Sequence, residues 1–215
     1  MLKKRIIALV LSAAIGVALA FGINAAFPSV FSDGSTKSGL CYETTGVCPD
    51  AIVASVDGIG VPADLYFYAL CYESSNMDQM LRYYTGSGID WEMELDAEQS
   101  IKDMVKDGAK ELLRQQIGIE AMAKQYGVTL SDAELDALAE IHAQTVETVG
   151  GEEAYLAEID KMGLREETYD RLLRSSYLYG SLGVLYDMPG SALYADTAAL
   201  MRYAAGQGYI TADHI

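Results

Sequence analysis

Residues 101–117, with the sequence IKDMVKDGAKELLRQQI, carry the clearest structural signal in this chain. Apolar side chains recur there at the spacing of one helix face, and they are Ile101, Met104, Val105, Ala109, Leu112, Leu113 and Ile117. Charged side chains occupy the opposite face, and they are Lys102, Asp103, Lys106, Lys110 and Arg114. This periodicity predicts an amphipathic α-helix whose apolar face must be covered by other elements. The stretch therefore indicates a packed helical domain.

Capping signals mark the limits of this helix and of the next one. We expect the first helix to begin near Asp96, with Gln99 as its capping-box partner, and to end at Gly127, which supplies a left-handed cap. A second capping box lies at 131–134, and the helix that follows it ends at Gly150. One face of that helix is formed by Leu135, Leu138, His142 and Val146.

Three more helices are predicted towards the C-terminus. They cover about 152–163, 165–189 and 191–205, and each ends at or near a glycine or proline. The connections between them are short, which is typical of helices that pack against their neighbours.

Two strands complete the expected fold. Residues 52–56 alternate β-branched side chains and stop at the turn dipeptide Asp57-Gly58. Pro62 then starts a helix over about 63–84. Residues 212–215 predict a strand at the end of the chain. The expected fold class is mostly α, a multi-helix domain with one short N-terminal strand and one C-terminal strand.

The first 26 residues predict export. Lys3-Lys4-Arg5 forms a positive segment, residues 6–23 are apolar and uncharged, and small residues suited to signal peptidase lie near their end. We favour a cleaved signal peptide, and a signal anchor that holds residues 6–26 in the membrane is the alternative. The protein is then secreted or held at the outer face of the cytoplasmic membrane. Residues 27–51 lack periodicity and predict a linker.

The composition argues against a nucleic-acid partner. The 215 residues are 51% apolar and carry 31 acidic against 15 basic side chains, a net charge of −16. Such a chain is long and apolar enough to bury one or two cores. Its acidic surface repels phosphate backbones, while it favours solubility and unfolded cationic clients. The charge alone names no partner, and a solvated surface is its simplest explanation.

The cysteine and histidine pattern predicts neither a metal site nor a cofactor. Three cysteines and two histidines show no paired ligand spacing. Cys41 and Cys48 flank a short loop that a disulfide could close in an oxidising compartment. Cys71 lies in an apolar run and is expected to be a buried, unreactive thiol. His142 shares an apolar helix face, which favours a core or boundary histidine over a catalytic one.

Several segments also occur in an order typical of one family of exported proteins. They are VASVDG at 53–58 before a helix, GVTLSDAELDA at 127–137, GGEEAYLAEIDKMGLREETYDRLLR at 150–174 and the strand at 212–215. Together they resemble the N-terminal region of SurA/PrsA-type parvulin foldases, although Asp57 stands where asparagine is common. The resemblance implies a helical chaperone domain at 52–205. It also implies that 206–215 is the first strand of a parvulin domain that is cut off at Ile215.

The resemblance implies an exported folding factor that binds unfolded polypeptides and whose parent protein isomerises X-Pro peptide bonds. His214 is the only residue here that matches the parvulin catalytic pattern, so we expect no isomerase site in this chain. Client binding is expected from side chains beside the 86–90 loop, and they are Met80, Tyr83, Tyr84 and Trp91. There are two alternatives. The chain is a stand-alone exported holdase, or it is a structural or interaction module without isomerase activity.

Overall fold

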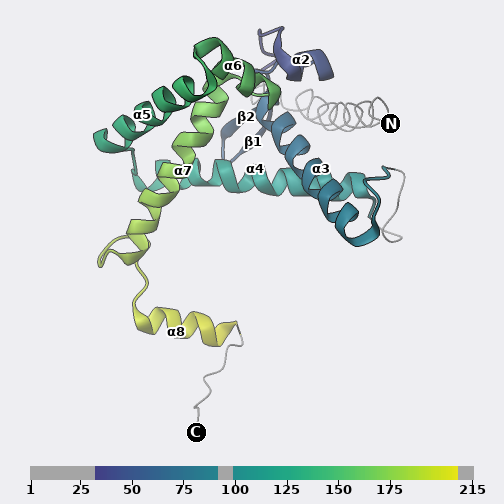
Figure 1. Ribbon diagram of the computed structural model, residues 1–215. Coiled ribbons are helices and arrows are strands. Elements are labelled where there is room, and N and C mark those ends of the chain that lie inside the picture. The colour runs from purple at the N-terminus through teal and green to yellow at the C-terminus, as the bar shows by residue number, and fades with distance from the viewer. Residues whose placement is uncertain (1–31, 92–98, 208–215) are drawn as a thin grey trace.

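The computed structural model describes residues 32–91 and 99–207 of the chain (Figure 1). These residues form seven α-helices and a two-stranded sheet, which confirms the mostly α fold class. The predicted leader at 1–26, the C-terminal strand at 212–215 and His214 lie outside the described residues. Among the helices that are described, none combines the length and the hydropathy needed to cross a membrane.

A β-hairpin opens the packed part of the chain. Strand β1 (Ile52–Val56) is the predicted strand, and β2 (Ile59–Pro62) pairs with it in antiparallel register. Asp57 and Gly58 both have positive φ, at 50° and 78°, as a type I′ turn requires. The expectation of a single strand here was wrong, because this turn sends the chain straight back along β1.

Helix α3 (Ala63–Thr85) follows Pro62 directly, as expected. Its first two turns are buried against the hairpin and the rest of the main core through Ala63, Leu65, Tyr66, Phe67, Ala69 and Leu70. The second half of the helix is largely exposed, apart from residues such as Leu81. The start of α3 therefore anchors the core, and its end projects from it.

Helix α4 (Ile101–Tyr126) is the predicted amphipathic helix. Its buried side chains recur every fourth residue as far as Ile117, and they are Ile101, Val105, Ala109, Leu113, Ile117 and Ala123. The expected start near Asp96 with Gln99 as a partner was wrong, because Gln99 precedes the helix and Ser100 caps it. The Ser100 hydroxyl accepts a hydrogen bond from the backbone N–H of Asp103.

Four helices complete the described chain. They are α5 (Asp132–Val149), α6 (Glu152–Lys161), α7 (Glu166–Asp187) and α8 (Thr197–Gly206). The capping box of Ser131 and Glu134 at the start of α5 is confirmed. The last helix begins later than the expected Ser191, because the side chain of Asp196 accepts from the backbone N–H of Ala199 and sets the helix start.

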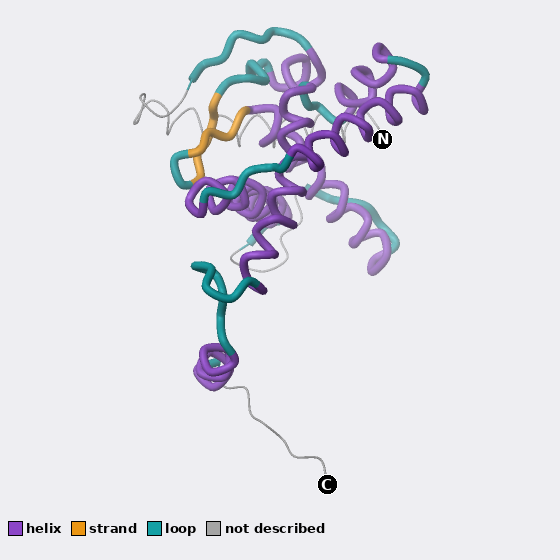
Figure 2. Tube along the Cα trace, turned by 90° about the vertical axis from the view of Figure 1, so that its left-hand side faces the viewer, coloured by secondary structure: helices purple, strands orange, loops and turns teal. Residues whose placement is uncertain are grey.

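The elements are arranged around α4, which runs across the middle of the molecule in Figure 1. Helix α3 packs against α4 on one side, and α7 crosses it elsewhere. The hairpin also contacts α4 and lies beside it in Figure 2. Helices α5 and α6 form a smaller core with α7 around Tyr155, Ile159 and Leu164. Helix α8 stands apart below the other helices in Figure 1.

Two polar contacts hold α7 in this position. The fully buried carboxylate of Asp64 accepts hydrogen bonds from the Arg165 side chain at 3.0 Å and from the Thr168 hydroxyl at 2.6 Å. Further along α7, Arg171 makes a two-point contact with Glu120 of α4, at 2.7 and 2.9 Å, and also donates to the carbonyl of Gly60. These contacts join residues distant in sequence, so the first ties the start of α7 to α3 and the second ties α7 to α4.

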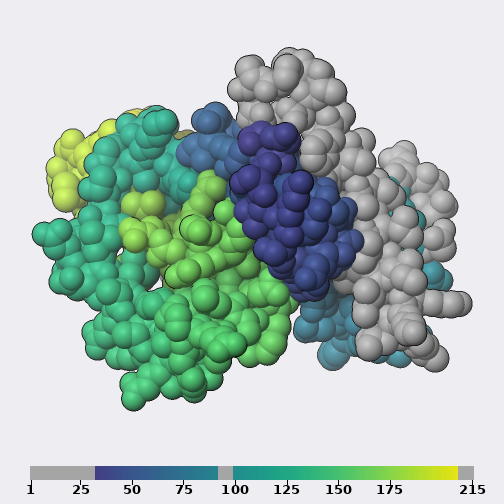
Figure 3. Space-filling model, turned by 90° about the horizontal axis from the view of Figure 1, so that it is seen from above, coloured from purple at the N-terminus to yellow at the C-terminus, as the bar shows by residue number. Residues whose placement is uncertain are grey.

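The described part of the expected linker, residues 32–51, is packed onto the domain instead. It contains helix α2 (Gly39–Thr45), and Figure 3 shows this purple segment lying against the green helices. The carboxylate of Asp50 accepts hydrogen bonds from Ser35 and Thr36, and Asp160 of α6 accepts one from the N–H of Leu40. Cys41 and Ala51 of this segment are also buried in the main core. The composition did not predict this packing, because the segment lacks the periodicity of a regular helix or strand.

All three cysteines are free thiols in the structure, so the disulfide that Cys41 and Cys48 could form is not present in it. Cys41 is buried in the main core, where burial raises the pKa of its thiol to about 12. Cys71 is half-buried, and burial raises its pKa to about 11. Because the thiolate is the reactive form, the expectation that Cys71 is unreactive agrees with this environment.

Candidate functional site

The predicted client-binding residues differ in their exposure. Tyr83 and Tyr84 at the end of α3 are 83% and 77% exposed, and their rings meet edge to face at 5.0 Å between centroids. Met80 is exposed on the same helix. Trp91, in contrast, is half-buried and packs against the main core. None of these four side chains lines the two cavities described below.

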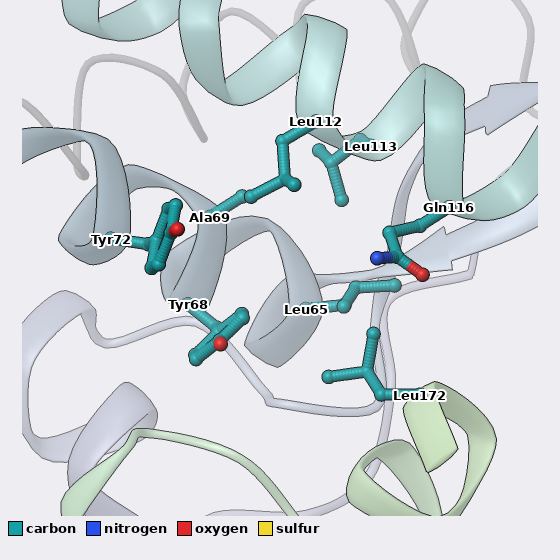
Figure 4. A pocket seen from close by; sticks show the side chains of 8 residues that line it. All are labelled: Leu65, Tyr68, Ala69, Tyr72, Leu112, Leu113, Gln116 and Leu172. Carbon is teal, nitrogen blue, oxygen red and sulfur yellow. The ribbon is translucent and has the colours of Figure 1, made fainter. Parts of the chain in front are cut away.

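A small pocket lies between α3, α4 and α7 (Figure 4). It encloses about 240 Å³ and is lined by Leu65, Tyr68, Ala69, Tyr72, Leu112, Leu113, Gln116 and Leu172. The rings of Tyr68 and Tyr72 lie 6.3 Å apart, and burial raises the pKa of Tyr68. Its size suits one or two side chains and not a length of polypeptide.

A larger groove lies between α4 and the second half of α7. Its volume is about 890 Å³, and we call it the α4–α7 groove. Its main lining residues are Gly118, Ile119 and Met122 of α4 with Tyr179, Gly180, Gly183 and Tyr186 of α7. Tyr179 is 69% exposed and Tyr186 is 52% exposed, so both rings border the groove without being part of the core.

Three glycines inside helices shape this groove. Glycine costs about 1 kcal/mol relative to alanine in a helix interior, so its presence there calls for a reason. A Cβ atom placed on Gly118, Gly180 or Gly183 would have no neighbouring atom within 4 Å. Close packing of the helices therefore does not explain these glycines. Their effect is to leave the surface between α4 and α7 hollow.

Further exposed apolar side chains lie in the C-terminal part of the described chain. Val184 and Met188 are exposed at the end of α7. On α8, which has no buried residue, Leu200, Met201 and Tyr203 are all more than half exposed. Exposed apolar side chains grouped in this way are typical of a surface that contacts another polypeptide.

The groove carries little charge compared with the rest of this acidic protein. Arg114 is the charged side chain in its lining, and it already contacts Glu111 one turn earlier on α4. The other polar lining residues are neutral, namely Gln115, Gln116 and Ser176. Such a surface can bury apolar side chains of many sequences, with amide and hydroxyl groups at its rim for the client backbone.

The bounds predicted for this helix, about 165–189, do not indicate the groove. Leu172 and Leu182 lie on the face of α7 that packs inward, whereas Tyr179, Gly183 and Tyr186 recur on a second face at helical spacing. The signal that could have revealed it is the combination of helix-interior glycines with unburied tyrosines.

The chain matches no protein-family model, no curated protein and no solved structure at a significant level. The geometry of the site must therefore carry the functional argument.

Proposed function

We propose that this chain is the client-binding region of an exported folding factor, and that the α4–α7 groove receives apolar segments of unfolded polypeptides. The observation that carries the proposal is the hollow groove of about 890 Å³, which three helix glycines line and two exposed tyrosines border. The acidic surface elsewhere keeps the chain soluble while it exposes apolar side chains.

The groove is suited to weak and adaptable binding. Burial of one leucine-sized client side chain contributes about 1.5–3 kcal/mol. Ordering of the flexible client opposes this gain, so moderate affinity and spontaneous release are expected. Met122 and the two tyrosines supply contact area that tolerates different client sequences.

The proposal includes a parent protein that continues into a parvulin isomerase domain. Rotation about an X-Pro bond has a barrier of about 18–20 kcal/mol, and the resemblance to SurA/PrsA-type foldases supports a catalytic module after residue 215. His214 would be the first residue of its site. The residues up to 207 then hold the client and do not lower this barrier.

Filling the groove tests the proposal directly. The double substitution Gly180→Leu and Gly183→Leu places side chains where the groove is hollow, and both positions favour leucine over glycine as helix residues. The purified chain should slow aggregation of an unfolded client, and the double variant should bind that client about tenfold more weakly or worse, the loss expected for one leucine-sized contact. A matched control is Ala143→Leu, which adds an exposed leucine on α5, away from the groove.

Three outcomes separate the alternatives. Equal client binding by the double variant and the control would contradict the groove assignment. No effect of the wild-type chain on aggregation would favour a structural or interaction module. Acceleration of a proline-limited refolding step by this chain would contradict the division between binding and isomerisation. The intact mass of the natural protein distinguishes a longer foldase from a stand-alone holdase.

A further inference from the structure

One histidine and two glutamates form a cluster away from the α4–α7 groove. It lies where α5, α6 and α7 meet, at the upper end of α7 in Figure 1. His142 comes from α5, Glu152 is the first residue of α6, and Glu166 is the first residue of α7. One nitrogen or oxygen atom from each of the three lies within 4.8 Å of the other two.

The imidazole of His142 provides an independent observation at this cluster. Its side chain is 41% exposed, but the Nε2 atom itself is buried and has no hydrogen-bond partner among the described residues. Nε2 lies 3.8 Å from a carboxylate oxygen of Glu152, too far for a hydrogen bond. Buried polar atoms in proteins normally have a partner, so this ring nitrogen beside two carboxylates is available to bind one.

The ring is also held in place. Tyr155 of α6 meets it edge to face at 4.8 Å between centroids, and Tyr169 of α7 meets Tyr155 at 6.3 Å. The carboxylates of Glu152 and Glu166 lie beside the His142 ring, and the negative potential they create is the kind that attracts a cation.

We propose that His142, Glu152 and Glu166 bind a divalent transition-metal ion, with zinc as the expected occupant. One imidazole nitrogen and two carboxylate oxygens are a donor set that zinc accepts. With bonds of about 2.1 Å at tetrahedral angles, ligand atoms stand about 3.4 Å apart. The three ligand atoms lie within 4.8 Å of one another, so the exposed glutamate side chains would rotate towards the ion to complete the site.

Such a site would join three helices that otherwise share a small core. That core contains Tyr155, Ile159 and Leu164 as its buried residues. A metal ion bound to one side chain from each of α5, α6 and α7 would restrain the α5–α6 pair against the start of α7. We infer a structural role, because the three ligands come from three different helices and lie outside the α4–α7 groove.

Helix-end electrostatics offers a competing explanation for the two glutamates. Carboxylates are stabilised in the first turn of a helix, and Glu153 and Glu167 occupy the next positions in the same two helices. These neighbours are not part of the cluster. The pair Glu153→Gln and Glu167→Gln is therefore a matched control, since it removes the same charge from the same helix ends.

The test measures Zn²⁺ and Co²⁺ binding to the full chain without an affinity tag, under reducing conditions. Zn²⁺ should bind wild type and raise its melting temperature. The double variant Glu152→Gln and Glu166→Gln should lose more than about a hundredfold in affinity, since loss of even an outer-shell partner costs 10- to 100-fold. The Glu153 and Glu167 control should bind like wild type.

Two further measurements complete the test. The visible absorption of bound Co²⁺ should disappear in His142→Gln and persist in His214→Gln, which removes the other of the two histidines. Circular dichroism of each variant checks that it is folded before metal is added. Failure of wild type to bind Zn²⁺, a Co²⁺ spectrum with thiolate charge-transfer bands, or equal loss in the two double variants would overturn the proposal.

Discussion

Replacing Asp64 with asparagine is expected to lower the free energy of unfolding by about 3 kcal/mol. Asp64 is fully buried at the start of α3, and its carboxylate accepts hydrogen bonds from the backbone N–H and the side chain of Arg165, from Thr168 and from the N–H of Leu65. The substitution removes the charge that faces Arg165 and leaves an amide donor against its guanidinium group. The structure therefore predicts a large loss of stability, although the substitution only replaces a carboxylate oxygen with an amide nitrogen.

The size of the effect follows from the burial of the pair. Loss of one partner from a fully buried ion pair costs about 3–5 kcal/mol. The Arg165 side chain is 27% exposed and regains some hydration when it is left unpaired, so the lower end of this range applies. For a domain of this size each kcal/mol lowers the melting temperature by about 2–4 °C, which gives a decrease of about 6–12 °C.

Urea unfolding followed by far-ultraviolet circular dichroism measures this loss. Asp170→Asn is the matched control, because it breaks the exposed pair with Arg174 on the same helix and should cost less than about 0.5 kcal/mol. Asp64→Asn combined with Arg165→Met should cost less than the sum of the two single changes. A loss below about 1 kcal/mol for Asp64→Asn, or strict additivity in the double variant, would refute the role assigned to this contact.

Three further outcomes test other parts of the structure. Burial opposes ionisation of Asp50, but hydrogen bonds from Thr36 and Ser35 outweigh it and lower the pKa of Asp50 well below the usual range. The stabilisation from these hydrogen bonds is therefore complete above about pH 4, and it is lost as the pH falls further. The protection of the Ser35 amide against hydrogen exchange, relative to its intrinsic rate at each pH, should therefore fall in acid and in Asp50→Asn. Unchanged protection would count against an ordered 32–51 segment. Ser131→Ala should cost about 1 kcal/mol of unfolding free energy through loss of the α5 cap, and a neutral result in urea unfolding would contradict this. Burial raises the pKa of Cys41 to about 12, so its thiol should react slowly with a thiol reagent at pH 8. The reaction rate should rise about tenfold for each pH unit until the pH reaches this pKa. Rapid labelling of the native protein at pH 8 would show that Cys41 is not buried.

The candidate site was only partly predictable from the sequence. Aromatic and methionine content drew attention to Tyr83 and Tyr84, which are exposed, and equally to Trp91, which packs against the core. Periodicity identifies which residues share a helix face, and it does not tell which of two apolar faces is covered. On α7 that choice depends on α4, which approaches from a distant part of the sequence.

The sequence by itself determined the local structure of this protein. The turn at Asp57-Gly58, the capping box at 131–134 and the glycine after α4 each act within a few residues, so their geometry follows from local hydrogen bonds and allowed φ values. Only the tertiary structure decided how the helices cross. Asp64 and Arg165 meet across about a hundred residues of chain, and His142, Glu152 and Glu166 come together from three helices. Side-chain contacts of this kind depend on the packing of whole elements, which no single stretch of sequence encodes.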